Sequence, residues 1–330
     1  MDPTPAKSKQ SVLAAIGLFF LAPLVAEFLL GNLSITMLPA LVVLAPSYGG
    51  GALLIRELAR RSGRGWPTVV LLALAYGILE EGFTTQSLFN PNYLSLNMHL
   101  LQSAYIPALG IGGWWTVFVL ALHTVWSISV PIALVEATVP ERATTPWLGR
   151  PGLWVAAVLF VLGSAAVTLG SYRQDHFVSS TAQFIAAAAA IALLVFAAFS
   201  VSNPGGPGSF GLIPNPWLAG ALALVCGSAI LMIPPRWGWG AVGAILLIEL
   251  GMAAAVLIWA KRGGWSLRHK LALASGATLA YAWHSFTEPP VAGGTGVVTR
   301  AGNAVFTLGA LALIGFAAKR SSAAMGDAAD

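Results

Sequence analysis

Two adjacent glutamates, Glu80 and Glu81, end an apolar stretch of the chain, and His123 stands in the middle of the next apolar stretch. A carboxylate can take a proton from water, and a histidine can carry a proton, bind a metal ion or stabilise developing negative charge. Adjacent residues on an α-helix point about 100° apart, which predicts that only one glutamate faces a given cavity fully. These three residues are candidates for acid–base catalysis or proton transfer.

Four further residues are candidates for the same site. Glu27, in LAPLVAEFLLGN, lies at a similar depth of an earlier apolar stretch, and Asn90 and Asn92 follow the two glutamates in NPN. We expect these three residues to support the site or to bind substrate. His176, in the polar segment SYRQDHFVSS, is the fourth candidate catalytic residue, because this segment could lie over the same cavity.

A glutamate–histidine set can also hold a divalent metal ion, which would then activate the water. The sequence does not require one. The zinc-peptidase motif HExxH is absent, and no GxSxG, Walker A or dinucleotide-binding motif lies between a strand and a helix. The cofactor therefore stays unassigned, and a divalent metal is the class that these residues would suit.

The composition requires a membrane around these residues. Only 9% of the 330 residues are charged, against about a quarter in soluble domains, while 57% are hydrophobic and the mean hydropathy is +0.79. Such a chain can be neither a soluble globular protein nor a disordered one. Its 17 basic residues are too sparse for a nucleic-acid surface. The expected partner is the lipid bilayer, with a membrane-embedded or lipid-like substrate.

Ten apolar stretches are long enough to be membrane-spanning helices. The composition and these stretches predict an all-α, polytopic transmembrane helix bundle. The stretches are 12–31, 36–55, 67–86, 113–134, 152–171, 181–200, 217–234, 238–260, 271–287 and 302–318.

The basic residues indicate how this bundle is oriented. With the N-terminus in the cytoplasm, ten spans place 14 basic residues inside, and only Arg173, Arg236 and Arg300 outside. Both termini are then cytoplasmic, and Glu80 and Glu81 lie in the outer half of the membrane. Arg56 and its acidic neighbour Glu57 are expected to anchor a span at the inner interface. We expect an integral, multi-pass protein of the plasma (inner) membrane, of bacterial type.

The chain is expected to divide unevenly. Residues 1–200 form a six-span bundle that carries the polar site, and 201–216 form a Gly/Pro-rich loop. Residues 217–330 form a four-span accessory bundle with a short cytoplasmic tail. A single ionisable residue, Glu249, stands alone in the eighth span.

The order of these motifs resembles the CAAX-prenyl-protease and bacteriocin-processing family of intramembrane proteases. The first motif of that family is EExxxR; Glu80 and Glu81 match its glutamates, and Thr85 stands where the arginine is expected. The second motif has an aromatic residue four positions before a histidine. Here Val119 holds that position before His123.

The third motif of that family is a histidine with Asn or Asp four residues later. His176 is followed at this spacing by Ser180. The resemblance covers about residues 67–180. It implies that membrane-embedded glutamates and histidines activate a water molecule for peptide hydrolysis.

Three functions are compatible with these residues. In an intramembrane hydrolase, Glu80 or Glu81 would act as general base on water, and His123, with His176, would stabilise the oxyanion or bind the water. In a proton-coupled transporter or lipid-handling protein, the same residues would form a proton relay. In a non-catalytic membrane partner protein they would be structural. The spacing from the two glutamates to the histidine favours the hydrolase.

Overall fold

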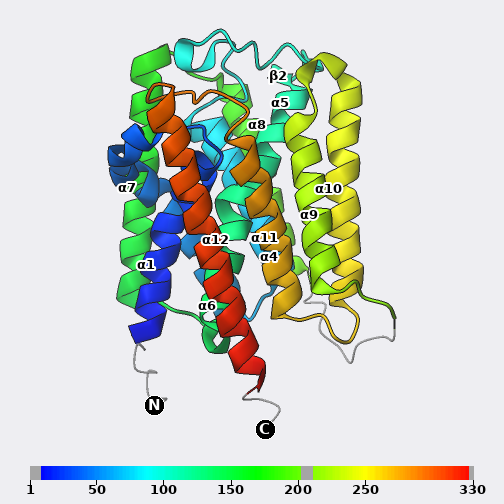
Figure 1. Ribbon diagram of the computed structural model, residues 1–330. Helices are drawn as coiled ribbons and strands as arrows, with labels where there is room; N and C mark the ends of the chain where they lie inside the picture. Colours follow the sequence, from blue (N-terminus) through cyan, green and yellow to red (C-terminus); the bar gives the residue numbers. More distant parts are fainter. Residues whose placement is uncertain (1–8, 202–210, 327–330) are drawn as a thin grey trace.

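The computed structural model describes residues 9–201 and 211–326. Within these ranges ten long helical segments coincide with the ten apolar stretches, so the all-α transmembrane bundle is confirmed (Figure 1). Eight of them are long and apolar enough to cross a membrane, while α9 (Pro216–Met232) is shorter and α11 (Leu267–His284) begins with a charged turn. The first helix begins and the last helix ends at the same end of the bundle.

Each of the first four spans contains a π-helical segment. Helix α1 (Lys9–Pro23) continues into η1 (Leu24–Leu29), and α4 (Trp66–Leu79) continues into η4 (Glu80–Thr84). The second span consists of η2 (Ile35–Ala40), α2 (Leu41–Leu44), η3 (Ala45–Gly49) and α3 (Gly50–Arg61). The fourth span consists of α5 (Gly113–Ala121), η6 (Leu122–Ser129) and α6 (Val130–Thr138). The π-helical segments are η1, η3, η4 and η6. Hydrogen bonds in a π-helix run from i to i+5, so each turn holds more residues than an α-helical turn.

The later spans are regular α-helices. Helix α8 starts at a capping box in which Ser180 and Gln183 bond each other's backbone nitrogens, and Asn215 caps the start of α9. These later helices are α7 (Arg150–Asp175), α8 (Thr181–Ser200), α9, α10 (Trp239–Ala260), α11 and α12 (Val297–Gly326). Short 3₁₀ turns occur at η5 (Tyr93–Ser95), η7 (Pro140–Arg142) and η8 (Pro235–Trp237).

The connection between the third and fourth spans closes one end of the bundle (cyan, at the top of Figure 1). Residues 86–104 of this connection are called the cap below. The cap leads into a hairpin of β1 (Tyr105–Ile106) and β2 (Ile111–Gly112), which pair antiparallel with Tyr105 opposite Gly112. These are the only strands in the described part of the chain.

The last two helices pack into the first six-span group rather than forming a separate bundle. Trp126 on η6 stacks on Tyr281 of α11 at 4.6 Å between ring centroids, and its indole nitrogen donates to the carbonyl of Ala277. Helices α11 and α12 also pack against α6. Helices α11 and α12 therefore share a packed core with the first spans, while α11 also packs against α9. Residues 202–210, most of the expected loop, lie outside the described residues.

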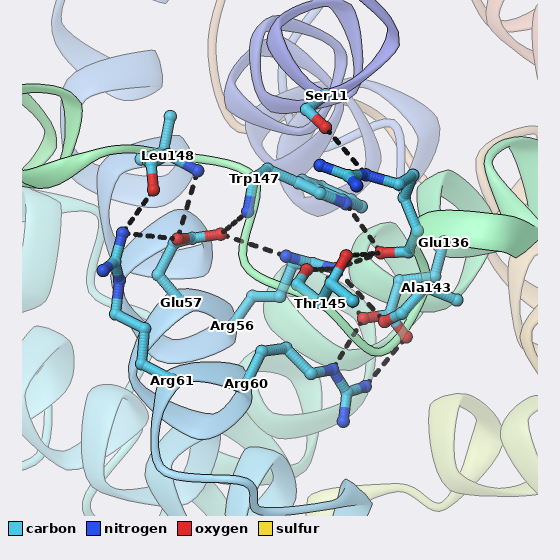
Figure 2. A network of polar contacts seen from close by, with 11 residues as sticks. Ser11, Arg56, Glu57, Arg60, Arg61, Glu136, Ala143, Thr145, Trp147 and Leu148 are labelled. Atoms are coloured by element: carbon cyan, nitrogen blue, oxygen red, sulfur yellow. Dashed lines mark hydrogen bonds and ion pairs between the residues drawn. The ribbon is translucent and has the colours of Figure 1, made fainter. Parts of the chain in front are cut away.

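The end of the bundle opposite the cap holds a buried network of ion pairs (Figure 2). Arg56 and Glu57 are both fully buried, and Arg56 lies 3.0 Å from Glu57 and 3.1 Å from Glu136. The guanidinium of Arg60 donates two hydrogen bonds of 2.9 Å to Glu136. The expected interface anchor is therefore wrong for Arg56 and Glu57, because partners on α6 and in the following loop hold these charges inside the protein.

The same network fixes the loop between α6 and α7. Glu57 accepts hydrogen bonds from the backbone nitrogens of Trp147 and Leu148, and Arg56 donates to the carbonyls of Arg142, Ala143 and Thr145. The guanidinium of Arg56 also lies 3.3 Å from the centre of the Trp147 ring (Figure 2). These contacts connect α3, α6 and the loop, and so hold together the ends, opposite the cap, of spans that carry the site.

Candidate functional site

Glu80, Glu81 and His123 meet in one buried cluster between the third and fourth spans. They are 2%, 6% and 5% exposed. Nε2 of His123 lies 2.6 Å from Oε1 of Glu81 and 3.7 Å from Oε2 of Glu80. The two spans approach closely at Gly77, where an added Cβ would lie 3.1 Å from the Cβ of His123. The structure therefore brings these three candidate residues together.

Both glutamates face the histidine, contrary to the expectation that only one of them could do so. The reason is local: Glu80 and Glu81 begin the π-helical η4, and His123 lies in the π-helical η6. A π-turn holds more residues than an α-turn, so it rotates the chain less per residue and keeps adjacent side chains closer to one face.

Both oxygens of Glu81 have hydrogen-bond partners. Oε1 bonds His123, while Oε2 accepts from the hydroxyl of Thr85 at 3.0 Å and from the hydroxyl of Ser87. The indole nitrogen of Trp115 donates to Ser87 at 2.9 Å and so fixes that hydroxyl. Thr85, four residues after Glu81, therefore serves as a neutral donor to its carboxylate.

One carboxylate oxygen of Glu80 is the hydrogen-bond acceptor of the cluster that has no partner. This atom, Oε2, is fully buried and has no hydrogen-bond partner in the structure. Buried polar atoms are normally hydrogen-bonded, and an exception at a cluster of ionisable groups indicates a place for a water, a proton, a metal ion or a substrate atom. This oxygen is the position in the cluster where an additional group can bind.

His123 is held by residues that the sequence did not single out as catalytic. Ser127, one turn further along η6, lies 3.2 Å from Nδ1 of the imidazole. The rings of Tyr48 and Tyr76 each pack 5.9 Å from the imidazole centre, that of Tyr48 nearly parallel to it. The spacing of Ser127 from His123 is a signal of a shared helix face. Nothing in the sequence distinguishes the two tyrosines from other aromatic residues of apolar spans.

Glu27 lies next to the cluster and has its own partners. The hydroxyl of Tyr48 donates to Oε1 of Glu27, and Nδ2 of Asn32 donates to Oε2, both at 2.6 Å. Tyr48 thus contacts both Glu27 and His123. Glu27 and Tyr48 lie in the π-helical η1 and η3, so every π-helical segment of the described chain carries a residue of the site or its neighbour.

The structure does not bring His176, Asn90 or Asn92 to the cluster. His176 directly follows α7, is exposed, and packs its ring against Tyr172. Asn90 is buried and donates to the carboxylate of Asp175, the residue before His176. Asn92 accepts from a backbone nitrogen within the cap. These residues shape the cap and do not touch Glu80, Glu81 or His123.

The cluster has the donor set of a divalent metal site. Glu80, Glu81 and His123 each offer one ligand atom, and these atoms lie within 4.8 Å of one another. Imidazole nitrogen and carboxylate oxygen are both ligands that zinc accepts. The short contact between His123 and Glu81 also serves as an acid–base hydrogen bond, so the three residues can work on water with or without a metal ion.

Residues 17–328 match an uncharacterized membrane protein family. No curated protein and no solved structure matches the chain. The match covers nearly the whole length of the sequence and includes the two glutamates, the histidine and all ten helical segments in whole or in part. The chain is therefore a multi-pass membrane protein and belongs to this uncharacterized membrane protein family.

Proposed function

We propose that the protein is an intramembrane hydrolase of peptide bonds, acting on a membrane-embedded or lipid-like substrate. The observation that supports this most is the convergence of Glu80, Glu81 and His123, buried between two spans, with one carboxylate oxygen free. Ionisable residues inside a membrane are expensive and mark functional sites by default. The partial resemblance to the CAAX-prenyl-protease and bacteriocin-processing family points to the same chemistry.

The hydrogen bonds divide the roles between the two glutamates. Glu81 uses both oxygens on fixed partners, so it orients His123 and compensates a positive charge on it. Glu80 has a free oxygen 3.7 Å from Nε2 of His123. A water bound at this oxygen would lie next to both the base that takes its proton and the imidazole. Glu80 is thus the general base, and Glu81 is the positioning residue.

The proposed reaction follows from these positions. Glu80 takes a proton from the water, the water oxygen bonds to the peptide carbonyl carbon, and the carbonyl oxygen becomes negatively charged. The positive charge of protonated His123, which Glu81 holds next to Glu80, stabilises that oxygen electrostatically. When the carbon–nitrogen bond breaks, Glu80 returns its proton to the leaving amine. The products are a carboxylic acid and an amine, and no redox partner is involved.

Peptide cleavage by the purified protein tests this proposal. A library of fluorogenic peptides in detergent micelles is incubated with wild-type protein and with Glu80→Gln, Glu81→Gln and His123→Ala. We expect turnover to fall about 100-fold or more in Glu80→Gln, and less in Glu81→Gln. The matched control is Glu249→Gln, another intramembrane glutamate, on α10. Equal activity in all variants would refute the proposal.

A proton relay is a second candidate, and one observation favours it. Asn32, Glu27 and Tyr48 are joined by hydrogen bonds, and the Tyr48 ring continues this row to His123. Glu27, Tyr48 and His123 are the titratable members of this row, and such groups can carry protons in a transporter. Proteoliposomes with an internal pH dye test this: Tyr48→Phe should abolish proton movement if the row conducts, whereas a hydrolase should keep cleaving peptides in that variant.

We place the protein in the plasma (inner) membrane, with the cap on the outer side. The placement is supported by the fully helical bundle and by the excess of basic residues at the end opposite the cap. A reporter enzyme fused to the C-terminus, active only in the cytoplasm, tests this orientation, and activity only in a periplasmic reporter would contradict it.

A further inference from the structure

The cap over the cluster is held in a strained backbone conformation. In the described part of the chain, seven residues other than glycine have a positive φ, and six lie in the cap with φ of 52–59°: Gln86, Leu94, Ser95, Asn97, His99 and Ala104. A side chain in this left-handed region crowds the following carbonyl. Such conformations persist where surrounding contacts impose them, and they gather at ligand clamps and switch segments.

One carboxylate supplies several of the contacts that impose this conformation. Asp175, the last residue of α7, accepts hydrogen bonds from Nδ2 of Asn90 at 2.7 Å, from the backbone nitrogen of Leu94 at 2.9 Å and from the hydroxyl of Ser95 at 3.2 Å. The side chain of Gln174 donates to the carbonyl of Leu94 at 2.8 Å. The end of α7 therefore holds the most strained part of the cap.

Tyr93 links this strained part to the cluster. It interacts with Thr85, whose hydroxyl donates to Glu81. Burial, together with the charges of Glu81 and Glu80, raises the pKa of Tyr93 well above its usual value. Tyr93 is thus hydrogen-bonded to the residue that donates to Glu81, and a movement of residues 93–95 would break this link.

The base and the outer part of the cap differ in packing. Leu88 and Phe89 are buried and pack with Val119 and Ala187, so the base is anchored in the bundle. Further along, Leu96 is 48% exposed and Met98 is 37% exposed. Segments with few buried apolar contacts open locally at a lower free energy than the core around them. Residues 91–99 are exposed or half-buried, whereas Leu100 and Ala104 are buried, so opening would begin within 91–99.

We propose that residues 91–104 are a lid over the cluster and that Asp175 is the latch that holds this lid closed. Release of the latch lets the strained backbone relax and moves Tyr93 away from Glu80 and Glu81. The role of the lid rests on the proposed hydrolase: it admits water and substrate to Glu80 from the aqueous end of the bundle and then closes over them.

The accessibility of a cysteine below the lid tests this proposal. Thr85→Cys is introduced together with Cys226→Ala, so that the reporter is the single thiol of the full-length protein. Its rate of modification by a membrane-impermeant thiosulfonate reagent is measured with and without Asp175→Asn, which keeps the shape of the latch but removes its charge. We expect the rate to rise about tenfold, the effect of losing one net hydrogen bond to a charged group. The control Arg173→Gln changes a neighbouring exposed charge and should leave the rate unchanged.

Two further measurements separate the lid from protein folding and from catalysis. Ser95→Ala removes one latch bond and should raise the rate less than Asp175→Asn does, while circular dichroism of both variants stays that of the folded protein. Equal labelling rates in all variants would overturn the proposal. Faster labelling in Asp175→Asn without peptide cleavage by any variant would support the lid and refute the hydrolase. Cleavage lost in Glu80→Gln with labelling unchanged in Asp175→Asn would refute the lid alone.

Discussion

Replacing Glu136 by glutamine perturbs the buried ion pairs at the end of the bundle opposite the cap. The residue is 2% exposed, accepts two hydrogen bonds from Arg60 and lies 3.1 Å from Nε of Arg56. Glutamine keeps the shape of the side chain, but it removes the negative charge and points an amide donor at guanidinium donors. Arg56 retains Glu57 and three backbone carbonyls, whereas Arg60 retains the carbonyl of Arg64.

The geometry sets the size of the effect. A hydrogen bond to a charged group contributes about 1.5–3 kcal/mol, so the two bonds to Arg60 amount to roughly 3–6 kcal/mol. The amide oxygen of glutamine recovers part of this. Removing one partner of a buried ion pair costs about 3–5 kcal/mol, because the remaining charge is left desolvated. We therefore expect Glu136→Gln to lower the free energy of unfolding by about 3–5 kcal/mol.

Reversible unfolding in mixed micelles of increasing SDS content, followed by tryptophan fluorescence, measures this loss. The matched control is Glu141→Gln, because Glu141 is 54% exposed and lies 3.7 Å from Arg320 in a surface ion pair. Surface pairs contribute about 0–1 kcal/mol, so the control should change stability little. If Glu136→Gln and Glu141→Gln lose the same small amount, the reasoning that the network holds buried, mutually compensating charges is refuted.

Three further predictions concern single positions. In the wild-type protein, the raised pKa of Tyr93 means that the unfolded chain ionises before the folded one, so the stability of the cap should fall above about pH 10. Tyr93→Phe should abolish this fall, which hydrogen exchange of the cap amides measures. Ser180→Ala should destabilise α8 by about 1 kcal/mol in the same unfolding assay, through loss of the capping box. Gly276→Val should destabilise by about 1–3 kcal/mol or more, because a Cβ there would lie 2.0 Å from the carbonyl oxygen of Gly220. Its control, Gly309→Ala, has open space and should be near neutral.

The sequence was sufficient for the spans and for the centre of the site. Apolar runs of about 20 residues have few alternatives to a membrane helix, so all ten segments could be located. Glu80 and His123 could be paired because consecutive spans connected by one loop are often neighbours and the two residues lie at comparable depth. Charge scarcity made these residues conspicuous in a chain with 12 acidic residues.

The partners of those residues could not be predicted, because they depend on packing. In the sequence, Tyr48 and Tyr76 do not differ from other aromatic residues of apolar spans. Only the packing of η3 and α4 shows that their rings contact His123. Arg56 stands at the end of a span, where an arginine usually reaches the interface, and only the fold of the loop at 142–148 buries it. His176 was a candidate because histidine can carry protons. However, α7 continues to Asp175, so the carboxylate of Asp175 contacts the cap and His176 does not reach the cluster.

The π-helical segments make the site sensitive to chain length as well as to residue type. Each segment accommodates extra residues in a helix that would otherwise be regular. A deletion of a single residue within 82–84 would let that stretch return to α-helical hydrogen bonding and turn the residues on one side of it by about 100° relative to the other. Every polar group around His123 could then be retained in the sequence while the cluster was lost. A homologue with identical site residues but one residue fewer in this turn should therefore be inactive, although an inventory of its residues would look complete.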